Sequence, residues 1–101
     1  MDHTVLLVFG ILLSGIGIVN CAGNISTIHS YNRRKVKEED IPKYGKAVGT
    51  GTIIMGLSLV AAFFVLTFWD EAMLPYVICP GMIIGLAFIL YGQFKYNKGI
   101  F

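Results

Sequence analysis

The stretch AVGTGTIIMGLSLVAAFFVLTFW, residues 47–69, decides the fold of this chain, because its 23 residues include no Asp, Glu, Lys or Arg. A helix rises about 1.5 Å per residue and the hydrocarbon core of a bilayer is about 30 Å thick, so about 20 apolar residues are enough to cross it. The stretch is therefore predicted to be a membrane-spanning helix.

Two similar stretches lie on either side of it in the sequence. Residues 3–32 and residues 72–94, which are 30 and 23 residues long, also lack Asp, Glu, Lys and Arg. Of the 101 residues, 55% are hydrophobic and only 14% are charged, too few charges to cover a water-soluble domain of this length. We expect an all-α integral membrane protein, a single transmembrane domain over residues 1–101 with helices at about 4–22, 41–69 and 74–94.

Local signals support these helix boundaries. Met1 to His3 lack the positive charge that begins a signal peptide, so the first stretch is predicted to be a retained helix. Asp40 is a suitable N-cap and Pro42 fits the first turn of the second helix. Pro80 is predicted to kink the third helix, because it cannot donate a backbone hydrogen bond.

The eight Lys and Arg residues all fall on one side of this arrangement. Six lie between the first two apolar stretches and two at the C-terminus, whereas the second loop holds Asp70 and Glu71. Short cytoplasmic loops are enriched in Lys and Arg, so the protein is predicted to be N-out and C-in with a basic cytoplasmic loop between helices one and two. The basic residues of this loop are predicted to contact anionic lipid headgroups or a partner protein. They are Arg33, Arg34, Lys35, Lys37, Lys43 and Lys46.

Aromatic residues flank the predicted spans, as is typical of membrane interfaces. The outer belt is predicted to contain Phe68, Trp69 and Tyr76. The inner belt is predicted to contain Tyr31, Tyr44, Tyr91, Phe94 and Tyr96.

Small residues recur at helical spacing on one face of each predicted span. Such faces allow membrane helices to approach closely, either within one chain or between a chain and a second protomer or partner subunit. Both uses stay open. The opposite faces, with Leu6, Leu13, Ile53, Val60 and Ile84, are expected to meet lipid. The predicted packing residues are Gly10, Ser14 and Gly17 in the first span, Gly45, Gly49 and Gly56 in the second, and Gly81, Gly85 and Gly92 in the third.

The predicted spans carry no ionisable side chain that could hold a proton or pair with an ion, which argues against ion-coupled transport. His3 and His29 are predicted on opposite sides of the membrane and cannot share a metal. No serine has a basic partner at a spacing that indicates a nucleophile. We therefore expect no enzymatic activity, no catalytic or metal site, no cofactor and no nucleic-acid partner.

The loop between the first two predicted helices carries a motif. It consists of Tyr31-Asn32, Glu38-Glu39, Tyr44-Gly45-Lys46 and Gly49. This motif resembles a family of small three-helix membrane proteins of unknown function found mainly in Firmicutes. More faintly, the loop is similar to that of SdpI-like immunity proteins, which protect producing cells from a secreted killing factor. The resemblance implies a multi-pass protein of a bacterial plasma membrane and no known reaction.

These observations favour a non-enzymatic interaction or accessory protein that packs through its glycine-rich faces. Its expected partners are a bilayer with anionic headgroups and either a second copy or a larger membrane protein. Two alternatives stay open: a toxin-immunity or envelope-stress protein, and a holin-like pore or transport component.

Overall fold

The computed structural model describes residues 3–23 and 36–97. Three long helices account for most of this part of the chain: α1 (Thr4–Cys21), α2 (Ile41–Phe68) and α3 (Leu74–Tyr96). Each is long and apolar enough to cross a membrane. The predicted all-α fold with three candidate spans is confirmed, and the predicted helix ends differ from the observed ones by two residues at most.

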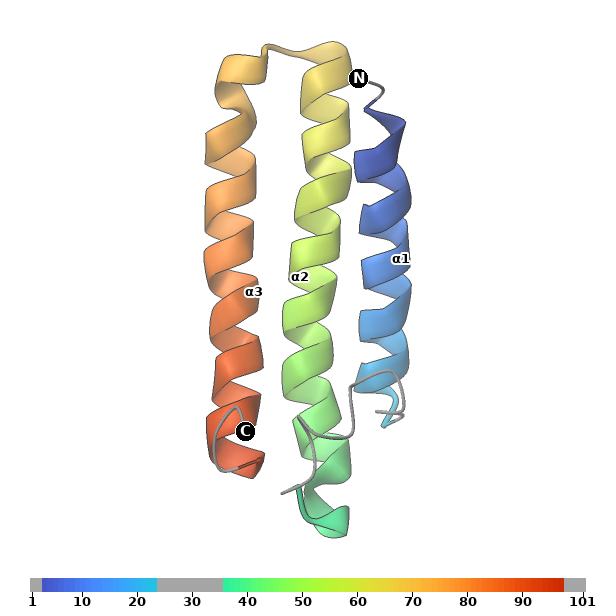
Figure 1. Cartoon of the computed structure of the whole chain (residues 1–101), viewed down its shortest axis with the longest axis vertical. Helices are drawn as coiled ribbons and strands as arrows, with labels where there is room; N and C mark the ends of the chain where they lie inside the picture. Colours follow the sequence, from blue (N-terminus) through green and yellow to red (C-terminus); the bar gives the residue numbers. More distant parts are fainter. Residues whose placement is uncertain (1–2, 24–35, 98–101) are drawn as a thin grey trace.

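The helices stand side by side, antiparallel to their neighbours in sequence, in a body that measures 45 × 19 × 19 Å. Figure 1 shows α2 in the middle, with α1 and α3 on either side of it. Both flanking helices pack along α2, whereas α1 and α3 hardly meet. The helices therefore form a row with α2 at its centre rather than a closed three-sided bundle.

Short turns of 3₁₀ helix precede the second and third helices. The turn η2 (Glu38–Asp40) leads into α2 and η3 (Glu71–Met73) leads into α3. The Asp70 carboxylate accepts a hydrogen bond of 3.1 Å from the backbone N–H of Ala72, which closes the tight connection at the end of α2. Asp40 does precede α2, but its side chain makes no capping hydrogen bond because η2 already occupies the helix entrance.

The ends of α1 and α3 follow ordinary helix chemistry. Gly23 adopts a left-handed conformation, with φ of 101°, just after α1, which is a common way to end a helix. The helix α3 continues through Pro80 as one element.

Candidate functional site: glycine contacts and an open groove

Two pairs of glycines bring α1 and α2 into close contact. A Cβ atom added at Gly17 would lie 2.6 Å from the carbonyl oxygen of Gly49, and one added at Gly49 would lie 2.5 Å from that of Gly17. Gly10 and Gly56 have the same reciprocal relation, at 2.7 Å in each direction. Such close backbone approach is open only to glycine and allows weak Cα–H···O contacts between the helices.

Small polar side chains complete this contact. The Ser14 hydroxyl donates a 2.8 Å hydrogen bond to the carbonyl of Gly10 in its own helix and lies over Gly56. The Cys21 sulfur lies over Gly49, 3.8 Å from the Thr50 hydroxyl. The predicted stripe of α1 thus faces α2 within one chain.

The expectation that Ile53 and Val60 meet lipid is wrong. An added Cβ at Gly17 would lie 2.6 Å from Cγ1 of Ile53, and one at Gly10 would lie 2.6 Å from Cγ2 of Val60. Each branched side chain fills the hollow that a glycine leaves on α1. Ile84, by contrast, is exposed, as expected.

A different set of small residues joins α2 to α3. Gly51 faces Gly85, and a Cβ added at Gly85 would lie 2.7 Å from the carbonyl oxygen of Gly51. The Ser58 side chain occupies the space over Gly81, and Ala47 lies 3.0 Å from a Cβ added at Gly92. All three predicted glycines of α3 therefore lie against α2.

Sequence reasoning assigned one small face to α2, but α2 has two. Gly49 and Gly56 face α1, while Gly51 and Ser58 face α3. At about 100° per residue, Gly51 points almost opposite to Gly49. The second face was visible in the sequence as small residues at i, i+4, i+11 and i+15, namely Ala47, Gly51, Ser58 and Ala62. The predicted Gly45 is buried in the second turn of α2.

Buried polar and aromatic side chains collect at the lysine-bearing end of the helices. The Asn97 amide donates a 3.1 Å hydrogen bond to the Gln93 side-chain oxygen, and both residues are buried. Asn20 at the end of α1 is buried as well. Tyr44, expected in the inner aromatic belt, has no exposed surface, so that expectation is wrong for this residue. Its ring packs beside Val48 instead.

The basic residues predicted to contact headgroups are only partly described. Arg33, Arg34 and Lys35 lie outside the described residues. Lys37, Lys43 and Lys46 are exposed at the end of the molecule where α2 begins. Lys43 and Lys46 border a groove of about 310 Å³ between α2 and α3.

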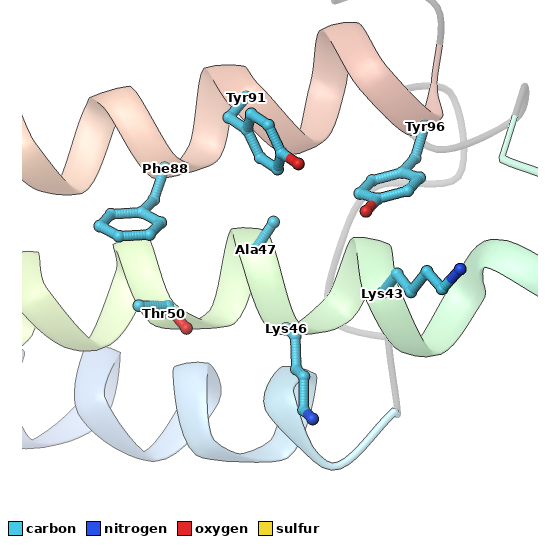
Figure 2. A pocket seen from close by; sticks show the side chains of 7 residues that line it. All are labelled: Lys43, Lys46, Ala47, Thr50, Phe88, Tyr91 and Tyr96. Carbon is cyan, nitrogen blue, oxygen red and sulfur yellow. The ribbon is translucent and has the colours of Figure 1, made fainter.

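Figure 2 shows how this groove is built. Its lining residues are Lys43, Lys46, Ala47 and Thr50 from α2, and Phe88, Tyr91 and Tyr96 from α3. The Lys95 ammonium donates a 2.9 Å hydrogen bond to the Tyr91 hydroxyl and lies 5.3 and 5.7 Å from the ring centres of Tyr91 and Tyr96. The groove thus combines an aromatic wall with a cationic rim.

Within residues 3–23 and 36–97, no three His, Cys, Asp or Glu side chains gather where they could hold a metal ion. Cys21 and Cys79 are free thiols. Comparisons with known protein families, with curated proteins and with solved structures found no match for this chain. The resemblance seen in the first loop therefore stays a prediction.

Proposed function

We propose that this chain is a non-enzymatic, multi-pass protein of a bacterial plasma membrane that acts by packing against another membrane component, either a second copy or a larger partner. One observation carries the proposal. Each flanking helix packs against α2 along one narrow face, and only 6% of the most apolar 18-residue stretch within Glu71–Tyr96 is buried. An apolar helix surface of this size needs lipid or another membrane protein to cover it.

The proposed orientation is N-out and C-in. It is supported by the described lysines, because Lys37, Lys43, Lys46 and Lys95 lie at one end of the row and the carboxylates of Asp70 and Glu71 lie at the other. The lysine-bearing end is then the cytoplasmic end.

The orientation is tested with two matched cysteine variants, Glu71→Cys and Glu39→Cys, in a background carrying Cys21→Ser and Cys79→Ser. Both glutamates are exposed in short 3₁₀ turns that precede a long helix. In intact cells an impermeant maleimide is expected to label Glu71→Cys, and to label Glu39→Cys only after the cells are opened. The reverse pattern would show that the orientation is wrong.

The interaction role is tested by photo-crosslinking in cells. Ile83 on α3 is 68% exposed, so a photoreactive phenylalanine there points away from the rest of the chain. We expect the probe at Ile83 to crosslink to a protein and to give one adduct band of the same mass in every experiment. The same probe at Tyr44, which is fully buried and already carries an aromatic ring, serves as the control and should give no intermolecular adduct.

The crosslinking result distinguishes the two kinds of occupant. A band at twice the mass of the chain identifies a second copy, and a larger discrete band identifies a partner subunit. Lipid adducts alone at Ile83, and at Ile11 on the outward face of α1, would contradict the proposed role.

A further inference from the structure

The groove between α2 and α3 runs from polar to apolar along its length. Lys43 and Lys46 stand in the first two turns of α2, whereas Thr50 and Phe88 lie further toward the centre of the helices. A second hollow of about 290 Å³, lined by Ala87, Phe88 and Tyr91, adjoins it and shares two of its residues. An occupant of both hollows must have a charged end and an apolar end.

We propose that this groove is a binding site for one anionic phospholipid. The phosphate of the headgroup lies at the lysine-bearing mouth of the groove, within reach of the long side chains of Lys43 and Lys46, and one acyl chain follows the wall formed by Phe88 and Ala87. The site assumes that the helices lie in a bilayer, as proposed above, but it does not depend on which end faces the cytoplasm.

The charges around the groove favour an anion. Lys43 and Lys46 are three residues apart on α2, and both border the groove. Figure 2 shows Lys43 extending along the start of α2 and Lys46 turned toward α1, so the two side chains must turn toward the groove to meet one headgroup. They lie near the helix N-terminus, where the macrodipole is positive. None of the seven described residues that line the groove is acidic, and Glu38 and Glu39 border a separate hollow together with Lys37.

The depth of the groove favours a lipid over a free anion. About 20 residues of α2 are enough to cross the hydrocarbon core, and α2 has 28 residues, so its first turns reach the headgroup layer. Lys43 and Lys46 then stand at phosphate level. Tyr91 and Tyr96 have the amphipathic character that suits this layer, and Ala87 and Phe88 continue the wall with apolar side chains.

The test is native mass spectrometry of the full chain in detergent with equimolar phosphatidylglycerol and phosphatidylcholine that carry identical acyl chains. We expect one phosphatidylglycerol to be retained per protomer, in at least tenfold preference to phosphatidylcholine. Each lysine near an anionic headgroup contributes roughly a factor of five in affinity. Lys46→Gln should therefore lower the retention of phosphatidylglycerol about fivefold, and Lys43→Gln with Lys46→Gln about 25-fold.

Lys37→Gln is the matched control, because it removes the same charge from an exposed lysine that borders the other hollow. It should change retention less than twofold. Ala87→Trp fills the adjoining hollow, where the acyl chain is proposed to lie, without changing the charge, and should lower retention at least tenfold. Melting temperatures in phosphatidylcholine verify that each variant is folded.

Three results would overturn the site. Equal retention of the two lipids would show that no anionic headgroup is recognised. Equal losses in Lys37→Gln and Lys46→Gln would show diffuse attraction to a basic end rather than a groove. Competition by millimolar inorganic phosphate would show a simple anion site without a place for the acyl chain.

Discussion

Leucine in place of Gly56 or Gly85 is expected to lower the melting temperature of the purified protein in detergent by roughly 10 °C or more, whereas leucine in place of Gly15 is expected to leave it unchanged or raise it slightly. The two interface glycines face backbone: added Cβ atoms would lie 2.7 Å from the carbonyl oxygens of Gly10 and Gly51 respectively. A backbone atom cannot swing aside as a side chain can, so the helices must separate. Overpacking typically costs about 1–3 kcal/mol, and a contact with backbone that cannot move belongs at the upper end of that range.

Gly15 is the matched control, because nothing lies within 4 Å of a Cβ added there. It sits in the middle of α1, so leucine gains helix propensity of roughly 0.8 kcal/mol over glycine at no steric cost. The same substitution therefore has opposite effects on stability at the interface glycines of α2 and α3 and at the exposed Gly15 of α1. Equal melting temperatures for the three variants would contradict the glycine contacts.

The architecture at the level of single helices could be predicted from the sequence. Charge-free runs of more than 20 residues can satisfy their backbone groups in a bilayer only as helices, and the observed ends of α2 and α3 lie close to the predicted ones. The short connection at residues 69–73 then makes α2 and α3 antiparallel. The small-residue spacing in α1 also indicated which of its faces lies against a neighbour.

The arrangement of the helices could not be predicted in the same way. A stripe of small residues identifies a contact face but does not name the helix that covers it, and three helices can form a triangle or a row. In a row the central helix needs two opposite faces, which is why Gly51 was missed. The same choice of neighbours placed Ile53 and Val60 against glycines of α1 rather than in lipid.

For the groove, too, the sequence predicted the properties of single residues but not how they come together. Lys43 and Lys46 were predicted to meet headgroups, and Tyr91 and Tyr96 to lie at the inner interface, each from its own position in the sequence. Their meeting around one groove depends on the register of α3 against α2, which is set by Gly51 on Gly85 and Ser58 on Gly81. The spacing of residues within one helix does not predict how far α3 is shifted along α2.

Tyr44 is the largest fully buried side chain among the described residues, and its position explains how α2 is anchored at the lysine-bearing end. Its ring forms a buried cluster with Val48. Half-buried side chains from the start of α2, from the segment before it and from α3 pack against that cluster. These side chains are Val36, Ile41, Ile89 and Tyr96. The cluster thus ties the segment before α2 to the last turns of α3.

Tyr44→Ala is therefore expected to cost about 3 kcal/mol, at the lower end of the range for truncating a large buried aromatic side chain. The lower end applies because membrane or detergent surroundings weaken the hydrophobic part of the loss, so that the lost packing contacts dominate. Thermal melting in detergent measures the effect as a fall in the melting temperature of roughly 10 °C or more.

Tyr76→Ala is the control, because Tyr76 is 80% exposed near the start of α3 and its removal should shift the melting temperature little. Tyr44→Phe, which keeps the ring, should retain most of the stability. If the Tyr44→Ala and Tyr76→Ala proteins had the same melting temperature, the buried cluster would not hold the helix ends together.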